Sequence, residues 1–455
     1  MKYLIPIVAA CLLLLPGCSK KDVTPPVYDS LGRINQWILD SMRRYYYWGD
    51  AISAKPVSTD PDVFFKSILS VNDRFSWISN GRDILPPSNS YFTYGFHYIL
   101  AQVDGYQGLV GVVTSVNTGG GADQAGFKRG SYFIAVNGEK ISNGNMPVIN
   151  LALRTPLSVK ITPATYDNNE WKPFAEVVLF PGYALENPAQ NVRTFQSNGV
   201  RTGYLYYSSF NESYDLQLLQ AVNKLKLASI TELILDIRYN AGGSVASSAK
   251  LAALITNKLN AAETYAIYEG NHVEGKRGRS LQEVLNTSSN TAGRKYEDLK
   301  PMQLSLNRVF ILTTGGTVSA AELIVNNLKP FLQVVQIGET TRGKNEAGFL
   351  IADGRNPTQV EWTLEPTVYK LFNKNNEGNY EKGLGPQYPV TEFATLPLTE
   401  MSAPNDPLVK KALEIIYGNN IPDNYTILKT GQPSVKVRPV YRSADEAAAE
   451  KMLVK

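Results

Sequence analysis

Apolar runs that alternate with helical stretches in the second half of the chain constrain its fold more than any other feature. Four runs of strand length lie at residues 203–208, 232–237, 308–313 and 332–337. Helical stretches follow three of them, at residues 214–227, 244–259 and 320–328, and Pro330 ends the last. Because strands that alternate with helices usually pair in parallel, this pattern predicts an α/β fold with a mainly parallel sheet.

The remainder of the chain predicts further domains, since 455 residues exceed the roughly 250 that one core usually organises. Apolar and aromatic residues recur at helical spacing up to residue 80, which predicts a small N-terminal helical domain over 31–87. Short β-like runs broken by glycine predict a β domain over 88–165, ahead of a core over 166–418. A tail over 419–455 follows, in which Ser443 and Glu446 are spaced as the capping box of a helix.

The start of the chain is typical of an export signal. The apolar run from Leu4 to Leu15 follows a basic Lys2 and is shorter than the roughly 20 residues of a membrane-spanning helix. Cys18 comes directly after it, in a context that resembles the bacterial lipoprotein box. We therefore expect a signal peptide over 1–17, an acylated Cys18 and a tether over 18–30. Such a protein is exported and anchored by lipid to a bacterial envelope membrane, facing the periplasm or the surface.

Composition narrows the classes of function. The one other cysteine, Cys11, falls inside the leader, so the mature chain offers no thiol for a disulfide, a metal cluster or a nucleophile. A formal net charge of +4 gives no electrostatic case for binding nucleic acid. We expect no metal and no cofactor.

Ser319 lies where a buried strand ends, glycines turn the chain and a helix starts. A lone serine at such a place is most often an ordinary N-cap, and Glu322 is spaced to complete a capping box. A second loop, with Gly343 and Lys344, follows one helix and one strand later. Because a right-handed crossover returns the chain parallel to itself, both loops are expected at the same edge of the sheet.

A third loop, with Gly242 and Gly243, also follows a strand and opens a helix at this edge. Backbone N–H groups of a glycine turn and of a helix start suit a developing oxyanion, so Gly242 or Gly243 with Ala320 fit that role. A tight strand-to-helix turn is the structural alternative for the two glycines.

A serine nucleophile needs a base, and the only histidines, His97 and His272, lie outside these loops. Lys344 can serve if it is neutral. Lowering the pKa of a lysine from about 10.4 to about 7 costs roughly 4 to 5 kcal/mol, which desolvation in a closed pocket can supply. Arg342 would act in the same direction only if it pointed inward.

These segments together resemble the C-terminal processing, or tail-specific, serine peptidases. The motifs are Asp236-x-Arg238-x-Asn240-x-Gly242-Gly243, Thr317-x-Ser319-Ala320-x-Glu322, Gly343-Lys344 and Gly383-Leu384-Gly385-Pro386. The resemblance implies a crotonase-like or ClpP-like α/β core, with Ser319 as nucleophile and Lys344 as general base. Many members carry a glutamine four residues beyond the lysine, where this chain has Gly348. Glu346 or Glu322 are the alternatives for orienting Lys344.

The glycine-rich segment resembles a PDZ domain of the bacterial protease type. Tyr94, Gly95, Phe96 and His97 match its carboxylate-binding loop, and the β-like runs and turns that follow have the order of that domain. By this resemblance the domain captures the end of a polypeptide by strand addition. An exposed loop residue is the alternative for His97.

The sequence therefore favours a serine endopeptidase that cleaves exported proteins and recognises their C-terminal ends through the PDZ-like domain. One alternative is a peptide-binding lipoprotein that keeps the fold with little or no catalysis. A second is a crotonase-like enzyme acting on an acyl thioester, since fold alone does not fix function. The Ser319 and Lys344 segments and the export signal argue against this second alternative.

Overall fold

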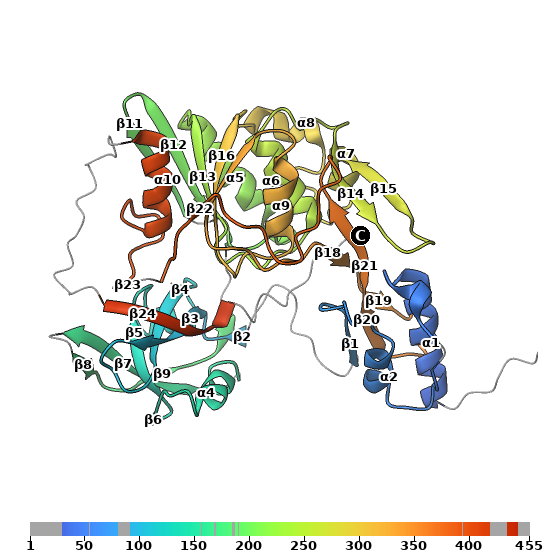
Figure 1. Cartoon of the computed structure of the whole chain (residues 1–455), viewed down its shortest axis with the longest axis horizontal. Helices are drawn as coiled ribbons and strands as arrows, with labels where there is room; N and C mark the ends of the chain where they lie inside the picture. Colours follow the sequence, from blue (N-terminus) through green and yellow to red (C-terminus); the bar gives the residue numbers. More distant parts are fainter. Residues whose placement is uncertain are drawn as a thin grey trace, which may run out of the picture.

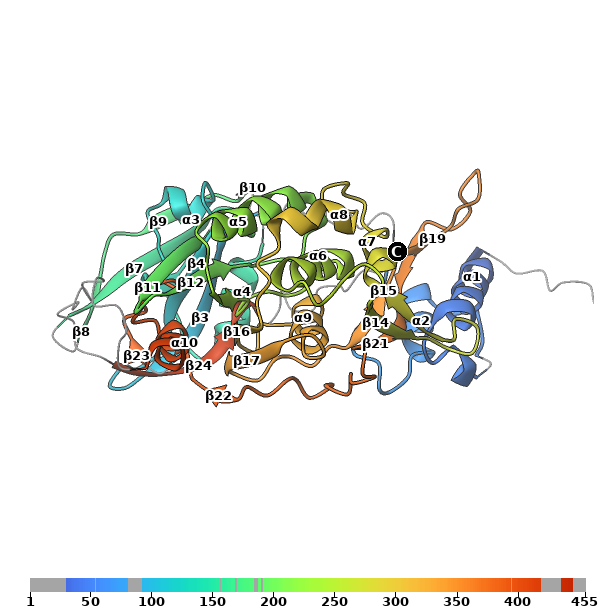
Figure 2. The same ribbon diagram turned by 90° about the horizontal axis from the view of Figure 1, so that it is seen from above.

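The computed structural model describes residues 30–53, 55–80, 92–155, 157–167, 170–183, 187–189, 191–393, 395–418 and 435–444. The predicted signal peptide, Cys18, almost all of the tether, and the tail beyond residue 444, where a helix is expected, lie outside these ranges. In Figures 1 and 2 the N-terminal helices and a β-rich domain lie at opposite ends of an α/β core.

The core sheet follows the predicted alternation. Its strands, in spatial order, are β11 (Val192–Ser197), β12 (Val200–Tyr206), β13 (Glu232–Asp236), β16 (Arg308–Thr313), β17 (Gln333–Gly338) and β22 (Tyr388–Pro389). From β12 to β22 every neighbouring pair is parallel, and only β11 runs antiparallel to its neighbour. The predicted α/β class and mainly parallel sheet are confirmed.

Helices cover both faces of this sheet, which explains why its strands read as continuous apolar runs. Val309 and Ile311 of β16 pack with α5 (Asp215–Leu227), α6 (Val245–Ile255) and α9 (Ala320–Leu328). Phe310 and Leu312 point to the opposite face and pack with α10 (Pro407–Tyr417). Successive residues of a strand thus enter two different cores.

A second sheet extends the core toward the N-terminal helices. It contains β15 (Lys276–Ser280), β14 (Thr264–Glu269), β21 (Thr367–Phe372) and β18 (Glu346–Gly348). The short helices α7 (Leu281–Leu285) and α8 (Tyr296–Leu299) and the 3₁₀ turn η3 (Lys300–Met302) lie between β15 and β16 along the chain. The 3₁₀ turn η2 (Glu212–Tyr214) directly precedes α5.

The N-terminal domain is helical as predicted, but a later segment completes it. Its elements are α1 (Ser30–Tyr45), η1 (Gly49–Ala51), α2 (Pro61–Ser67) and β1 (Trp77–Asn80). Strand β1 pairs with β20 (Trp362–Glu365), which in turn pairs with β19 (Ile351–Ala352). Leu364 of β20 packs in the same apolar cluster as Ile38 and Phe64.

The β-rich domain forms one large sheet. Its strands, in order, are β23 (Thr395–Leu396), β24 (Val435–Arg442), β3 (Phe96–Val103), β4 (Val110–Val116), β5 (Tyr132–Val136), β7 (Val159–Asp167) and β8 (Glu170–Pro173). Beside them lie β6 (Glu139–Lys140), β9 (Val177–Leu179), α3 (Gly121–Gln124) and α4 (Met146–Ala152), while β2 (Phe92–Thr93) pairs with β10 (Gly182–Tyr183). Strand β24 comes from the C-terminal tail, where the sequence predicted only a helix farther on. No described helix has the length and apolar character needed to cross a membrane.

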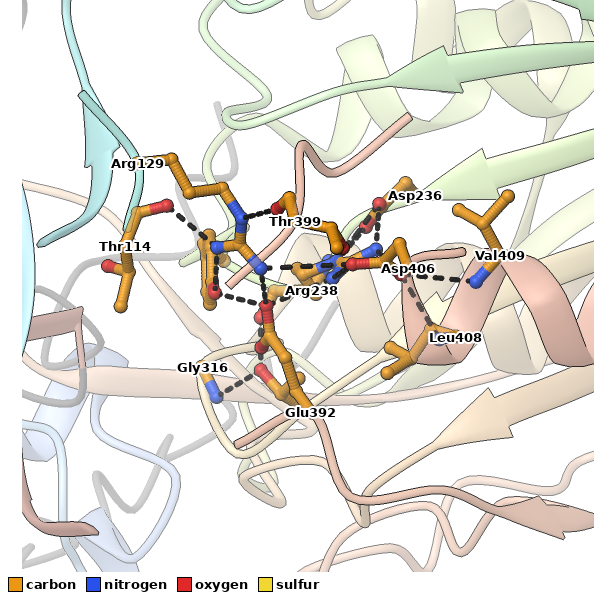
Figure 3. A network of polar contacts seen from close by, with 12 residues as sticks. Thr114, Arg129, Asp236, Arg238, Gly316, Glu392, Thr399, Asp406, Leu408 and Val409 are labelled. Carbon is orange, nitrogen blue, oxygen red and sulfur yellow. Dashed lines mark hydrogen bonds and ion pairs between the residues drawn. The ribbon is translucent and has the colours of Figure 1, made fainter. Parts of the chain in front are cut away.

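A buried ionic network connects the β-rich domain to the core (Figure 3). Arg238, two residues after the end of β13, donates to Asp236 at 2.7 Å and to Glu392 and Asp406 at 2.9 Å each. Asp406 also accepts the N–H groups of Leu408 and Val409 at the start of α10, so the network fixes that helix as well. All three carboxylates and the guanidinium are fully buried.

Arg129 links the β-rich domain to this network. Its guanidinium donates to Glu392 at 2.7 Å, to the Thr399 carbonyl at 2.7 Å and to the Thr114 carbonyl at 2.8 Å. Although burial opposes it, the charges of Arg238 and Arg129 hold the pKa of Glu392 below its ordinary value. Arg129 of the β-rich domain and Arg238 of the core therefore share the Glu392 carboxylate, which joins the two domains.

Candidate active site

Ser319 lies at the turn between β16 and α9, and its backbone is strained. Its φ of 62° and ψ of −120° fall outside the ordinary regions for a residue with a side chain. The side chain has an exposed fraction of 0%, and its Oγ has no hydrogen-bond partner among the described residues. The Ser319 N–H donates to the Glu322 carboxylate at 2.9 Å, so only that half of a capping box forms. Ser319 thus does not act as an ordinary N-cap.

Glu322 connects the serine turn to the lysine loop. Besides the Ser319 N–H, its carboxylate accepts the Thr341 hydroxyl at 2.5 Å and the N–H groups of Gly343 at 2.6 Å and Lys344 at 2.8 Å. Burial raises the pKa of Glu322, and these four donors oppose that rise because each favours the ionised form. One carboxylate therefore sets the spacing between the backbones of Ser319 and Lys344.

Lys344 is buried, with 4% of its surface exposed. Its Nζ lies 4.7 Å from the centroid of the Phe75 ring, a residue of the N-terminal domain. The neighbouring Arg74 donates to the Gly343 carbonyl. Arg342 is exposed. The N-terminal domain thus contributes directly to the surroundings of the lysine.

The glycine loop after β13 packs against the serine turn. The Val318 N–H donates to the Asn240 carbonyl at 3.0 Å. Gly242 has a φ of +103°, and a Cβ added there would lie 2.7 Å from the Ser319 Cβ. The Gly242 N–H donates to the Asn240 side chain at 2.8 Å, whereas the N–H groups of Gly243 and Ala320 have no acceptor among the described residues. The structure brings the three predicted loops together.

The last motif, at residues 383–386, packs against the loop that leads to Lys344. The Leu384 N–H donates to the Thr341 hydroxyl at 2.7 Å, and the Thr341 N–H donates to the Leu384 carbonyl at 3.2 Å. A Cβ at Gly383 would lie 2.1 Å from the Thr341 carbonyl oxygen, so only glycine fits. Gly348 is similarly confined, since a Cβ there would lie 2.3 Å from the Pro366 carbonyl oxygen. A glutamine at position 348 is incompatible with this backbone.

Glu346 is a buried carboxylate at the start of β18, two residues beyond Lys344. Burial raises its pKa, and the charges of Arg74, Lys370 and Lys344 oppose that rise. Its Oε1 lies 4.0 Å from the Arg74 guanidinium, and its Oε2 has no hydrogen-bond partner among the described residues.

The predicted peptide loop lies at the start of β3. The Tyr94 ring is buried, and its hydroxyl lies within hydrogen-bond distance of the carbonyl oxygens of Thr155 (2.7 Å) and Leu157, just beyond α4, which is a packing role. Gly95 has a φ of 74°, and its N–H donates to the Thr93 hydroxyl at 3.1 Å. Phe96 and His97 are half-buried at the first residues of the strand. The other histidine, His272, is exposed and pairs with Asp50.

Sequence reasoning did not identify Arg74 and Phe75 as neighbours of the lysine. They precede Lys344 by some 270 positions, and no local motif marks them. Within the described ranges, no group of three or more His, Cys, Asp or Glu side chains could hold a metal ion.

Comparison with known families gives the assignment. Residues 201–390 match the model of peptidase family S41, and residues 33–77 match the peptidase S41 N-terminal domain. The chain belongs to peptidase family S41. The two matches cover the serine, lysine and glycine loops together with the segment that holds Arg74 and Phe75.

Curated relatives include two carboxy-terminal processing proteases of Bacillus subtilis strain 168. CtpA is 25% identical over 313 residues, covering 66% of this chain and 58% of CtpA. CtpB is 24% identical over 279 residues, covering 60% of this chain and 50% of CtpB. The chain thus spans little more than half the length of these relatives.

Among solved structures, an S41 protease of Bacteroides fragilis NCTC 9343 matches with a TM-score of 0.68 and 24% identity. The match covers 87% of this chain and 100% of that one, and it shows the shared fold.

Proposed function

We propose that this S41 family member is a serine endopeptidase in which Ser319 is the nucleophile and Lys344 the general base. The observation that carries the proposal is the strained, buried Ser319, whose unpaired Oγ lies in a turn tied through Glu322 to the backbone of Lys344. Strain of this kind persists only where surrounding contacts hold it, and it clusters at functional sites.

The reaction follows the acyl-transfer scheme. A neutral Lys344 amine takes the Ser319 proton as Oγ attacks the scissile carbonyl carbon. The C–N bond then breaks, the leaving amine takes the proton from the lysine, and water hydrolyses the acyl-enzyme. The N–H groups of Gly243 and Ala320 are the donors available to the oxyanion, because Asn240 already occupies that of Gly242. Gly242 contributes by its lack of a side chain beside Ser319.

The substrates of the proposed enzyme are exported polypeptides. The β-rich domain would act as the PDZ-like unit, with residues 94–97 at the head of β3 as its peptide loop. Such domains bind an extended chain by adding it to an exposed strand. The names of the Bacillus relatives, carboxy-terminal processing proteases, favour recognition near polypeptide C-termini.

Membrane attachment through an acylated Cys18 is part of the proposal. Its basis is the short apolar run that ends just before this cysteine. Replacing Cys18 by alanine removes the only acylation site and should release the protein from the membrane fraction. Fractionation of cells that express each form measures this directly. A processed Cys18→Ala protein as firmly bound as the parent would contradict the lipid anchor.

The Ser319/Lys344 pair is tested by cleavage of an unfolded exported protein with purified variants. Ser319→Ala and Lys344→Ala should each lower kcat/KM by at least about a thousandfold, and the double variant should be little worse, since residues that act as one unit are not additive. Lys344→Arg should be inactive too, because a guanidinium stays protonated.

Lys382→Ala is the matched control, since Lys382 is exposed in the neighbouring loop, and it should cleave normally. Circular dichroism checks the fold of each variant. Near-normal cleavage by a folded Lys344→Arg variant would contradict the pair. Peptide binding without cleavage by the parent would instead support a non-catalytic peptide-binding lipoprotein.

A further inference from the structure

The C-terminal strand β24 lies along the edge of β3, the strand that begins at the predicted peptide loop (Figure 1). The two strands are antiparallel, with Val437 opposite Val103 and Arg442 opposite Ile99. The Tyr98 N–H donates to the Ser443 hydroxyl at 2.9 Å, next to the loop itself. An extended peptide added to this edge would run along the same line, so β24 occupies the position of a ligand.

Side chains of β24 also pack on the apolar surface that β3 and α4 share, which we call the β3–α4 groove. Val440 and Tyr441 pack on the apolar cluster that contains Tyr98 of β3 and Ile149 of α4. The Tyr441 ring centroid lies 5.8 Å from that of Tyr98. Pocket contacts of this kind give specificity to a chain that the sheet edge binds through its backbone.

The last residue of β24 and the residues that follow it reach the loops of the proposed active site. The Arg442 guanidinium bonds the Glu339 carboxylate at 2.8 Å, and Glu339 directly follows β17 in the segment that leads to Lys344. A Cβ added at Gly316 would lie 3.7 Å from the Ala444 Cβ, so the tail also contacts the turn that leads to Ser319. The described tail therefore joins the groove to both catalytic loops.

The pairing of β24 with β3 is interrupted, which suits a strand that can leave. Pro439 has no N–H to donate, and the register shifts between Pro439 and Tyr441. Ser319 is fully buried in this arrangement, so a substrate reaches it only after some part of the surroundings moves.

We propose that the C-terminal segment, residues 435–444, is an internal ligand of the β3–α4 groove that competes with polypeptide partners. The partner it implies is an extended chain with an aliphatic and an aromatic residue followed by a basic one, as in Val440, Tyr441 and Arg442. Displacement of the segment frees the groove and the contacts to Glu339 and Gly316 together. This inference rests on the proposed PDZ-like role of the domain.

A disulfide lock tests it. Gln102 and Arg438 lie opposite each other and their side chains hydrogen bond at 3.1 Å. Opposed Cα atoms in antiparallel strands lie about 4.5–5.5 Å apart, within reach of a disulfide. Gln102→Cys with Arg438→Cys, in the full chain with Cys11 and Cys18 replaced by alanine and Ser319→Ala, holds β24 in place when oxidised and releases it when reduced.

The probe is a fluorescein-labelled peptide with the sequence of residues 435–444, and fluorescence anisotropy gives its Kd. The oxidised protein should bind at least about tenfold more weakly than the same protein after reduction. The Gln102→Cys single variant is the control and should not respond to reduction. Equal affinity in both redox states, or no binding in either, overturns the proposal.

A gain of affinity provides the second measurement, which a folding defect would not produce. Tyr441→Ala removes the ring from the groove and should bind the peptide about tenfold more tightly than the parent, because the competing segment is weakened. Lys436→Ala, on an exposed position of the same strand, should leave affinity unchanged. Unchanged or weaker binding by Tyr441→Ala contradicts the inference.

Binding and cleavage separate this inference from the proposed activity. Peptide binding is measured without Ser319, so it responds to β24 even if the chain cleaves nothing. If the parent with an intact Ser319 cleaved no substrate while the binding responses persisted, the peptidase proposal would be overturned and the internal-ligand proposal would stand.

Discussion

Ser319 occupies a conformation that its neighbours impose. A side chain at positive φ outside a glycine costs about 1–3 kcal/mol, so it must be held from several sides. The Ser319 N–H is held by Glu322, and the preceding Val318 N–H is held by the Asn240 carbonyl. The result is an Oγ without a local partner at the head of a helix, where backbone donors lie close by.

Gly242 makes this arrangement possible at the scale of single atoms. Gly242→Ala would place a Cβ 2.7 Å from the Ser319 Cβ, in a residue whose φ of +103° already disfavours a side chain. Displacing the turn should lower kcat/KM by about a hundredfold or more, since catalytic groups tolerate little misplacement. Gly315→Ala is the control, because its Cβ would meet nothing within 4 Å. Equal activity of the two folded variants would show that Gly242 does not shape the site.

At the scale of elements, Glu322 joins the start of α9 to the loop after β17. Four donors converge on its carboxylate, which leaves no acceptor position to spare. A helix N-terminus also favours negative charge near its first turn. Glu322 thus fixes the spacing of two loops, and in the proposed mechanism it is a positioning residue that does not contact the reacting atoms.

Glu322→Gln tests this link. An amide nitrogen in place of one carboxylate oxygen faces N–H donors, so unfolding free energy should fall by about 1–3 kcal/mol and kcat/KM should fall with it. Glu283 makes the equivalent contact at the exposed start of α7, and Glu283→Gln should leave activity unchanged. Urea unfolding and steady-state cleavage measure both effects.

The Glu322→Gln variant also tests how stability depends on pH. Burial raises the folded-state pKa of Glu322 above its ordinary value near 4.5, so the protonated form stabilises the fold below that value. This contribution is lost as pH rises through the folded-state pKa. The Tm of the parent minus the Tm of Glu322→Gln should therefore be largest near pH 4 and should decrease at higher pH. A constant difference from pH 4 to 7 would contradict the shifted pKa.

Sequence periodicity predicted the strands and helices of the core sheet, whose formation depends on local patterns of apolar residues. The bounds of β16 and α9 are those of the apolar run and the helical stretch, and the parallel order follows from their alternation. The crossover rule placed the loops of Ser319 and Lys344 together because parallel strands share an edge. Strand β24 and the Phe75 contact escaped prediction, since each depends on a partner hundreds of residues away that no periodicity encodes.

At the scale of the whole molecule, one buried network holds the β-rich domain against the core. Arg129 and Arg238 share Glu392, and Asp406 extends the network to α10 (Figure 3). Breaking one member of a buried ionic group is costly because the remaining charges stay buried. The position of the β3–α4 groove relative to Ser319 therefore depends on these few charges.

Arg129→Met weakens the link between the β-rich domain and the core without removing any residue proposed for catalysis. Glu392 keeps Arg238 and Tyr239 as partners, but the carbonyl oxygens of Thr114 and Thr399 lose their donor. Unfolding free energy should fall by about 2–4 kcal/mol, and cleavage of a long unfolded protein should fall more than cleavage of a short peptide, because only the long chain needs both the groove and the serine. Lys128→Met, one residue earlier and exposed, removes the same charge from the surface and should change neither quantity. Urea unfolding measures the loss of stability, and cleavage kinetics are compared for the long protein and the short peptide. An equal loss of cleavage on both substrates would mean that the network serves stability alone. If the β-rich domain delivers substrate, the loss must be larger for the long chain, which reaches both the groove and the serine.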